Sequence, residues 1–370
     1  MKIARIICQI LRVPTSHQRS GSRSETLLVR VQTEDGLEGV GETDALPEAV
    51  KAVIDAPPWH TEARGLRDAL LGQNPLETAR LWRIMQAAIA DADCGSGAMA
   101  AIDIALWDLQ GKLFKQPIHR LLGGRMHERI RACVGLSFGH NAEETQAMAR
   151  RGPKAGYQAV ELGGELTGHT DLFDRELARG GRDGVGAASL LVDARRAWDM
   201  RTALRRAQSF TEFRVECLEN PLHADDAEAY AWLRDHSPIP IAAGANRSGR
   251  AAFRPFIDRR AADIYQVDLG RNGFTDAAFI RGRVEEIGGR LGSPCVSGPI
   301  IAASTLHWLA TCHDPFFFQE RGEDSPLRYN LVQERIQADE GWTPVPDAPG
   351  LGITLNESCV AQYLVAESGK

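Results

Sequence analysis

The sequence predicts an α/β fold in which a parallel barrel of alternating strands and helices follows an N-terminal domain of mixed α+β structure. From Arg129 onward, short apolar runs alternate with helical segments over about 190 residues, the pattern of repeated βα units. Asp193, Glu219 and Ala245 end three of these runs or follow them closely, at intervals of 26 positions. That interval is the length of one strand, one helix and their two connections. Before Arg129 the chain begins with strands and continues with helices.

The first segment predicts an antiparallel sheet. Residues 2–13 and 26–33 are rich in Ile, Val, Leu and Thr, and Asp35-Gly36 supplies a hairpin turn before Leu37 to Glu42. Residues 15–24 contain no apolar side chain, so we expect a solvated loop there. A lid over a binding site and an idle surface loop both fit that composition, and the sequence leaves the two open.

The next segment, from about Glu62 to Phe114, has the apolar spacing of helices. Its strongest part is Ala98 to Leu113, which Pro117 follows soon after its end. One stripe of this predicted helix carries Ile102, Ala105, Leu106 and Leu109.

The barrel strands are predicted from runs of β-branched and aromatic residues. They are Ile130–Val134, Tyr157–Leu162, Leu190–Val192, Phe213–Leu218, Ile239–Ala242, Ile264–Val267, Pro294–Val296 and Phe316–Phe318. Helical segments separate them, among them Ala142–Arg151, Met200–Ser209, Asp226–Asp235, Thr275–Glu286 and Ile300–Thr311. Gly341 to Leu355 is rich in Pro and Gly and is expected to run back across the surface towards the first domain.

The composition excludes several classes of partner. The 370 residues are 43% hydrophobic, which is enough for a large core, and the net charge of -6 comes with no basic stripe. Nucleic acid and acidic membrane surfaces are therefore not expected as partners. No run approaches the ~20 apolar residues that span a bilayer. The expected partner is a small molecule.

Cysteine usage predicts a reducing compartment. The seven cysteines stand apart from one another, with no Cys-x-x-Cys pair, which favours free thiols over disulfides or a zinc site. Residues 1–13 have the pattern of a strand and lack a signal-peptide cleavage site, so we expect a cytoplasmic protein. Cys217 and Cys295 lie near strand ends but are expected to be small core residues.

Charged side chains follow the predicted strand ends. Because the strand ends converge on one pocket in a parallel barrel, we expect these charged side chains to form one site. Its members are five carboxylates and one guanidinium, Glu161, Asp193, Arg195, Glu219, Asp268 and Glu320. Carboxylates on successive strands suit a hard divalent cation such as Mg²⁺. The alternative is that each acid caps the helix that follows it, but five acids at repeat spacing favour a site.

Residues 101–112, which read Ala-Ile-Asp-Ile-Ala-Leu-Trp-Asp-Leu-Gln-Gly-Lys, closely resemble the hallmark of the mandelate racemase and muconate lactonizing enzyme group of the enolase superfamily. Pro117 and Leu121-Leu122-Gly123-Gly124 complete that motif, and Pro349-Gly350-Leu351-Gly352-Ile353 resembles the C-terminal motif of the group. The resemblance covers nearly the whole chain and identifies it as a divergent member.

The resemblance implies a modified TIM (β/α) barrel with an N-terminal α+β capping domain. The expected boundaries are residues 1–128 for the capping domain, 129–330 for the barrel and 331–370 for a segment that returns to the cap. It also implies a half-reaction in which a Lys or His base removes the proton next to a substrate carboxylate, while magnesium holds the enediolate. We also expect a homo-oligomer.

The metal ligands that the resemblance implies are incomplete. Asp193 and Glu219 match the first two ligand positions of the group, in Leu-Val-Asp-Ala and Leu-Glu-Asn-Pro contexts. Ala245 stands at the third, where the group usually has Glu. A weak magnesium site on Asp193, Glu219 and water therefore stays open.

Both bases of the group are also replaced. The second-strand Lys-x-Lys motif corresponds to Glu161-Leu162-Gly163, and Gly298 stands where the seventh-strand His belongs. Asp268 matches the sixth-strand partner of that His, and Glu320 matches the eighth-strand acid that can bond the substrate carboxylate. Losing a positioned base costs about 10²–10⁴-fold in rate, so the usual chemistry of the group should be abolished.

These replacements predict a rebuilt site. We expect a lyase or isomerase that acts on a small carboxylic acid, with Glu161, Asp268 or Glu320 as acid–base groups. Arg195 is hypothesised to take part of the place of the metal, where it would pair with Asp193 and Glu219 and bind the substrate carboxylate. A solvated surface role for Arg195 is the alternative. The rival function is a noncatalytic relative that binds an acid or serves as an oligomer partner.

Overall fold

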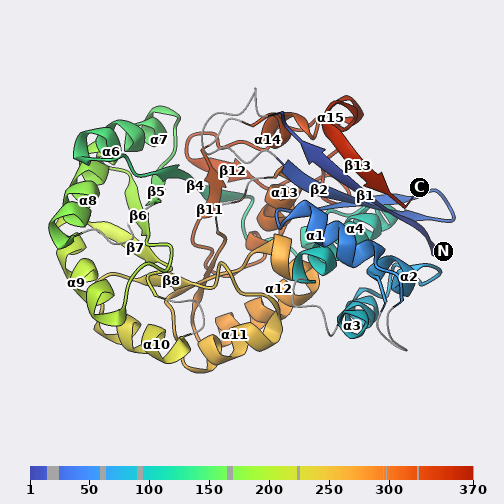
Figure 1. Ribbon diagram of the computed structural model, residues 1–370, viewed down its shortest axis with the longest axis horizontal. Helices are drawn as coiled ribbons and strands as arrows, with labels where there is room; N and C mark the ends of the chain where they lie inside the picture. Colours follow the sequence, from blue (N-terminus) through green and yellow to red (C-terminus); the bar gives the residue numbers. More distant parts are fainter. Residues whose placement is uncertain are drawn as a thin grey trace.

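The computed structural model describes residues 1–14, 25–58, 64–89, 95–164, 170–222, 226–294, 296, 298–322 and 325–369. The predicted loop at 15–24 and Cys295 lie outside the described residues. Figure 1 shows a ring of strands and helices beside a second unit of mixed structure, and both chain ends lie on that second unit. Within the described part of the chain, no helix has the length and apolar character that crossing a membrane requires.

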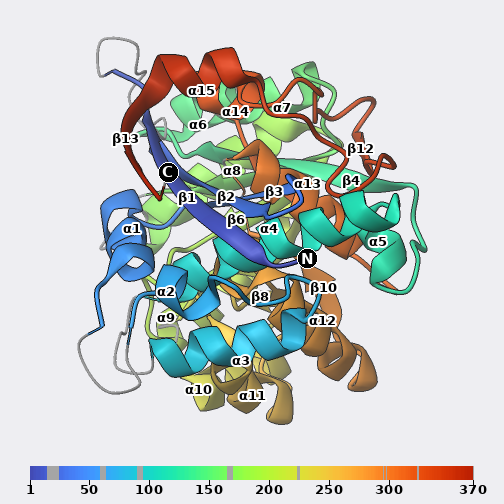
Figure 2. The same ribbon diagram turned by 90° about the vertical axis from the view of Figure 1, so that its right-hand side faces the viewer.

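The capping unit is built on a four-stranded antiparallel sheet in the order β13-β1-β2-β3 (Figure 2). Its strands are β1 (Ile3–Arg12), β2 (Glu25–Thr33), β3 (Glu38–Thr43) and β13 (Leu364–Ser368). The last strand of the chain therefore pairs with the first. Helices α1 (Pro47–Asp55), α2 (Leu66–Leu70), α3 (Thr78–Ala88), α4 (Ser96–Phe114) and α5 (Ile118–Leu121) complete this unit.

Helix α4 packs closely on β3 because the strand carries glycine where the two meet. A Cβ atom on Gly41 would lie 1.9 Å from the carbonyl oxygen of Ala101, and one on Gly39 would lie 2.0 Å from that of Ala105. Any side chain at either position would push the helix off the sheet. The apolar stripe of this helix therefore packs on a strand whose two glycines leave room for the helix backbone.

The ring in Figure 1 is an eight-stranded parallel barrel, as the alternation predicted. Its strands are β4 (Arg129–Ser137), β5 (Ala159–Gly163), β6 (Ser189–Asp193), β7 (Val215–Glu219), β8 (Ile241–Ala243), β9 (Ile264–Gln266), β10 (Arg290–Gly292) and β11 (Phe318–Arg321). The barrel closes between β10 and β11 through Val296, whose N–H donates to Gln319 O at 3.0 Å and whose carbonyl accepts from Arg321 N at 3.1 Å.

Helices surround the barrel, and Figure 1 shows α6 to α11 in sequence along its outer edge. They are α6 (Ala142–Ala149), α7 (Arg151–Lys154), α8 (Asp171–Val185), α9 (Met200–Phe210), α10 (Ala227–His236), α11 (Gly249–Asp258), α12 (Leu269–Glu286) and α13 (Pro299–Leu309). After the barrel come α14 (Pro326–Asn330), β12 (Trp342–Pro344) and α15 (Glu357–Tyr363).

Two strands lie at positions that differ from the predictions. The seventh strand is residues 290–292 and not 294–296, and the eighth is residues 318–321 and not 316–318. Arg290-Leu291-Gly292 contains a single β-forming side chain, so its strand signal is weak. Phe316 and Phe317 are buried against the barrel interior before regular pairing begins at Phe318.

The hallmark helix α4 connects the cap, the barrel and the C-terminal segment. Asp108 accepts hydrogen bonds from Val40 N on β3 and from Leu351 N, each at 2.9 Å, and pairs with Lys112 at 2.7 Å. One turn and a half earlier, Asp103 accepts from Thr275 N at 2.9 Å and from its hydroxyl at 2.6 Å, on barrel helix α12. The two acids of the motif, Asp103 and Asp108, are thus structural anchors.

His307 on α13 gives the chain a predicted sensitivity to acid. Its side chain is fully buried and its Nδ1 accepts from His119 N at 3.3 Å, and burial lowers its pKa to about 3. An unfolded chain binds a proton at this histidine near pH 6.5, so stability is lost as pH falls from 6.5 towards 3. We expect this group to remove about 2 kcal/mol of unfolding free energy between pH 7 and 5.

Urea unfolding of the wild type and of His307→Gln at pH 7 and pH 5 measures that loss. The decrease between the two pH values should be smaller in His307→Gln, whereas His313→Gln, at an exposed histidine, should behave as the wild type. Equal decreases in the wild type and His307→Gln would contradict the assignment.

Candidate active site

The barrel interior has an apolar floor. Inward side chains from the strands and from the segment before β11 pack together as Cys133, Ala159, Leu191, Cys217, Ala242, Ile264, Phe316 and Phe317. Burial raises the thiol pKa of Cys217 well above its usual value, so this cysteine is an unreactive core residue. The side chains that can carry chemistry therefore lie above this floor, towards the C-terminal ends of the strands.

Glu219 stands at the centre of the next layer. Its two oxygens accept hydrogen bonds of 2.5 Å each, one from the Gln266 side chain on β9 and one from the Gln319 side chain on β11. Burial raises the pKa of Glu219 well above its usual value, and the nearby charges of Glu161 and Asp193 raise it further. The two amide donors oppose that shift. Glu219 is thus a buried carboxyl that favours its protonated form.

Asp193, at the end of β6, pairs in register with Glu219 on β7 and with Gly163 on β5. Its Oδ1 accepts from Arg195 N at 2.9 Å and from the Asn220 side chain at 3.4 Å. Burial raises the pKa of Asp193, and the hydrogen bond from Arg195 N and the charge of Arg195 oppose the increase.

Arg195 contacts Asp193 through its backbone N–H. The residue has a left-handed φ of 49° and an exposed side chain, and Arg196 follows with φ of 63°. This tight turn aims the Arg195 N–H at the carboxylate. The hypothesis that the Arg195 guanidinium takes part of the place of a metal stays a prediction.

Glu161 completes a group of three carboxylates. A Cβ atom on Gly163 would lie 3.5 Å from Glu161 Oε1 and 3.6 Å from Asp193 Oδ2, so the two side chains flank the position of the missing lysine. The charge of Glu161 also acts on Glu219. The structure therefore brings together Glu161, Asp193 and Glu219 at the barrel mouth.

Asp268 and Glu320 are engaged elsewhere. Asp268 is the N-cap of α12, where it accepts from Gly270 N at 2.8 Å and pairs with Arg271 at 3.3 Å. Glu320 accepts from the Tyr157 hydroxyl at 2.6 Å and from the Arg328 guanidinium. Because the neighbouring Gln319 points into the barrel, Glu320 lies on the outer face of β11. The acid–base roles of Asp268 and Glu320 stay predictions.

The space beside Gly298, where the resemblance implies a histidine, is filled from the cap. The Glu42 carboxylate, at the end of β3, lies 2.0 Å from where a Cβ atom on Gly298 would stand. It accepts from Thr26 Oγ1 at 2.8 Å, Ile300 N at 3.0 Å and Ile301 N at 3.2 Å, at the start of α13. Gly298 is therefore required by Glu42, and no side chain fits there. Sequence reasoning missed Glu42.

Three further inward residues were missed, Gln266, Gln319 and Arg321. Arg321 lies two positions after Gln319 on β11, so strand alternation directs it towards the same interior. Its side chain is half-buried, and its charge lowers the pKa of Asp193. The signal that could have found these residues is the period of two, counted back from each strand end.

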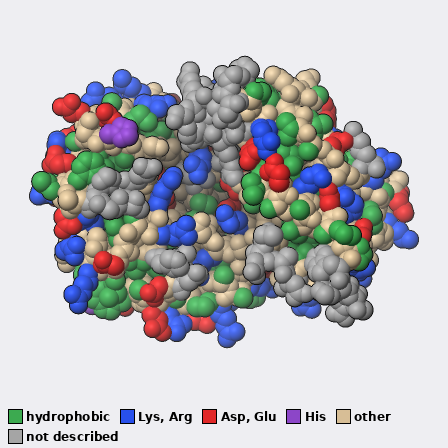
Figure 3. Space-filling view, viewed as in Figure 1, with side chains coloured by type: hydrophobic (Ala, Val, Ile, Leu, Met, Phe, Trp, Pro, Cys, Tyr) green, Lys and Arg blue, Asp and Glu red, His purple; other side chains and the backbone are tan. Residues whose placement is uncertain are grey.

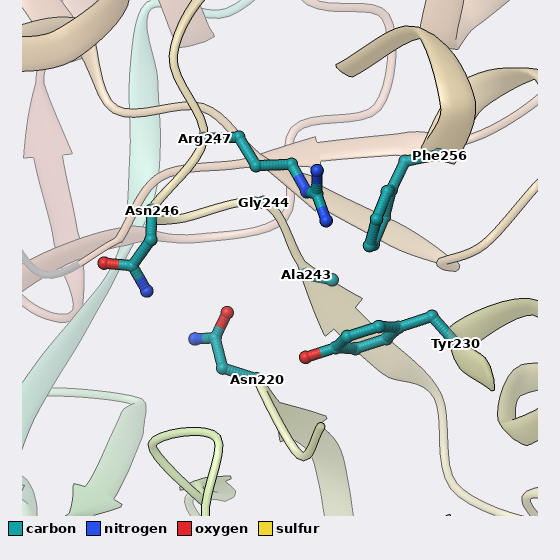
Figure 4. A pocket seen from close by; sticks show the side chains of 7 residues that line it. All are labelled: Asn220, Tyr230, Ala243, Gly244, Asn246, Arg247 and Phe256. Carbon is teal, nitrogen blue, oxygen red and sulfur yellow. The ribbon is translucent and has the colours of Figure 1, made fainter. Parts of the chain in front are cut away.

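A small hollow lies beside β8 (Figure 4). Its lining is Asn220, Tyr230, Ala243, Gly244, Asn246, Arg247 and Phe256. Ala243 packs with the core between strands and helices, so this hollow is outside the barrel interior. The Arg247 guanidinium lies 3.4 Å from the centre of the Phe256 ring, and Asn220 links the hollow to Asp193.

The donors present do not fit a divalent cation as they stand. Each oxygen of Glu219 accepts an amide N–H, Asp193 Oδ1 accepts two donors, and Ala245 offers no ligand atom. Among the residues described, no three His, Cys, Asp or Glu side chains are placed to hold a metal. The magnesium that the resemblance implies stays a prediction for this chain.

Basic side chains surround the mouth. On the face seen in Figure 3, Lys and Arg side chains gather round a hollow between the barrel and the cap. Arg195 and Arg196 come from the end of β6, and Arg321 comes from β11. The arrangement can attract an anion to a site that contains carboxyl groups with raised pKa values.

Comparison with known proteins gives consistent matches. The model for the mandelate racemase / muconate lactonizing enzyme N-terminal domain matches residues 8–123, and that for the enolase C-terminal domain-like family matches residues 143–359. D-galactarolactone cycloisomerase of Agrobacterium fabrum is 28% identical over 388 residues, covering 98% of this chain and 99% of that protein. D-galactonate dehydratase of Ralstonia pickettii is 28% identical over 378 residues, covering 91% and 90%.

A solved structure shows the same fold. The 3,6-anhydro-D-galactonate cycloisomerase from Zobellia galactanivorans superposes with a TM-score of 0.86, at 24% sequence identity, and the match covers 99% of this chain and 100% of that chain.

Proposed function

Because the chain belongs to the mandelate racemase and muconate lactonizing enzyme family of the enolase superfamily, we propose that it is a lyase or isomerase acting on a small hydroxy acid or sugar acid. Its relatives include a sugar-acid dehydratase and a sugar-acid-lactone cycloisomerase. The observation that carries the proposal is the group of Glu161, Asp193 and Glu219 at the barrel mouth, where two of the three carboxyl pKa values are raised. Carboxyl groups whose pKa values are raised by burial are suited to proton transfer.

In the proposed mechanism, Glu161 is the general base. It comes from the second barrel strand and lies beside Asp193 at 7% exposure, whereas Glu219 is 2% exposed and both of its oxygens accept amide N–H groups. Glu161 would remove the proton next to the substrate carboxylate, and guanidinium donors, with Arg195 among them, would stabilise the negative charge that develops. Asp268 remains the candidate for the second proton transfer, because Glu320 lies on the outer face of β11.

Product formation from a panel of sugar acids and other hydroxy acids tests the proposal. We expect turnover by the wild type and a decrease in kcat of about 10²–10⁴-fold in Glu161→Gln, the usual contribution of a positioned base. Glu212→Gln, at an exposed glutamate on the outside of the barrel, is the matched control. An unchanged kcat in Glu161→Gln would remove Glu161 from the mechanism.

The alternative function is a noncatalytic binder of acids. It is favoured by Gly163 and Gly298, which leave the two usual base positions without a side chain, and by Glu42, which closes the second of them. Such a protein would show a higher melting temperature with an acid in the panel but would form no product. Product from any acid would exclude this alternative.

A further inference from the structure

We propose that the guanidinium of Arg321 supplies, at the barrel mouth, the positive charge that a divalent cation would otherwise supply, and that it binds the carboxylate of the acid. The second half of this inference rests on the proposed function, whereas the first half rests on the geometry of the chain alone.

The direction of the Arg321 side chain follows from β11. Gln319 reaches across the barrel to Glu219, and Glu320 bonds Tyr157 and Arg328 on the other side of the strand. Because successive side chains alternate between the two faces of a strand, Arg321 points inward with Gln319. Its backbone N–H donates to Val296 O at 3.1 Å, which fixes it where the barrel closes.

The register of the sheet places Arg321 opposite Glu161. Arg321 pairs with Gly135 on β4, and Gly135 pairs with Glu161 on β5. Two strand spacings separate Arg321 from Glu161, which is about 10 Å between their Cα atoms. Gly135, which carries no side chain, is the one residue between them in this row. The guanidinium is therefore directed over Gly135 towards the carboxylates, and the charge of Arg321 acts on Asp193.

The carboxylates are arranged for a guanidinium more than for a bare cation. The side-chain amides of Gln266 and Gln319 donate hydrogen bonds to the two oxygens of Glu219. Ala245 offers no oxygen that could serve as a third ligand. A small divalent cation needs several oxygen ligands close together. A guanidinium needs only planar oxygen pairs at hydrogen-bond distance, and its remaining N–H donors can receive a second carboxylate in a bidentate pair.

Calorimetric titration with Mn²⁺ tests the charge substitution without any substrate. We expect no heat of binding in the wild type or in Arg321→Lys, because a fixed positive charge repels the metal. Arg321→Ala should gain affinity for Mn²⁺ of about tenfold or more, which corresponds to about 1.4 kcal/mol or more, because one like charge near the binding site is removed. Adding Asp193→Asn to Arg321→Ala should abolish the new binding.

Arg254→Ala removes an equal charge from an exposed position on α11 and should behave as the wild type. Circular dichroism and melting temperature establish that each variant is folded before titration. The charge substitution is overturned if the wild type binds Mn²⁺ as tightly as Arg321→Ala, or if folded Arg321→Ala gains no Mn²⁺ binding.

Thermal stabilisation by D-galactonate, D-gluconate and D-galactarate, with the polyols galactitol and glucitol as neutral probes, tests the second half. We expect at least one acid and neither polyol to raise the melting temperature of the wild type, and Arg321→Ala to lose that increase while Arg254→Ala keeps it. An increase that survives in Arg321→Ala overturns carboxylate binding by Arg321. If the Mn²⁺ result holds and none of these acids binds, carboxylate binding and the proposed function fail together, and the charge substitution stands.

Discussion

Replacing Asp108 with alanine is expected to lower the free energy of unfolding by about 3 kcal/mol or more. The carboxylate is fully buried in α4, and it accepts from Val40 N and Leu351 N at 2.9 Å each. The substitution leaves both N–H groups buried without their acceptor and removes the ionic partner of Lys112. Because these contacts join the cap strand, the hallmark helix and the C-terminal segment, the loss should affect the whole fold.

Urea unfolding at pH 7 measures the effect of Asp108→Ala. Asp108→Asn keeps one acceptor oxygen and should give an intermediate loss, whereas Asp183→Ala, in an exposed pair with Arg179 on α8, should change the free energy by less than about 1 kcal/mol. A loss of unfolding free energy in Asp108→Ala no larger than that in Asp183→Ala would show that the buried hydrogen bonds to Asp108 contribute little to stability.

The second large effect is expected for Arg206→Ala, at about 3–5 kcal/mol. Arg206 is 2% exposed and donates to Asp174 Oδ2 at 2.6 Å, which ties α9 to α8 outside the barrel. Without the guanidinium, Asp174 keeps its charge in a buried position but loses this partner. Desolvation of that charge, and not the lost attraction alone, sets the size of the effect.

Arg205→Ala is a matched control for Arg206→Ala. Arg205 is adjacent on α9 and pairs with Asp171 at 3.2 Å, but about half of its side chain is exposed. Its loss should cost less than about 1 kcal/mol. Both variants remove one arginine from the same helix, so equal losses in urea unfolding would mean that burial of the Arg206 pair does not matter.

Much of the fold could be predicted because it depends on periodicity. Alternation after Arg129 and the stripe on residues 98–113 correctly gave the barrel and α4. These signals are local and repeat many times, so single errors do not alter the architecture. The predicted position of the seventh strand was wrong for the opposite reason. Its three residues contain one apolar side chain, which is too few to show a repeating pattern.

The side chains of the site were harder to predict because a strand end depends on register. Counting inward positions from Phe316 gives Phe318 and Glu320, but Phe316 and Phe317 both pack against the barrel floor. The alternation therefore shifts by one, and Gln319 and Arg321 point inward instead. Asp193 and Glu219 lie on strands without such an irregularity at their ends, and the structure places both at the mouth.

Contacts between the cap and the barrel could not be predicted from any local pattern. Glu42 bonds Ile300 N across 258 positions, and nothing near either residue indicates the other. The restriction that Glu42 places on residue 298 arises only from the packing of the cap against the barrel.

The overlap of Glu42 with the space above Gly298 also restricts how this site can change during evolution. A histidine restored at position 298 would collide with the Glu42 carboxylate, so the first substitution would be harmful unless residue 42 had already become smaller. Losing Glu42 first would leave the N–H groups of Ile300 and Ile301 without their acceptor. Each single step is therefore unfavourable, and introducing a histidine base at position 298 requires two coordinated changes on different domains.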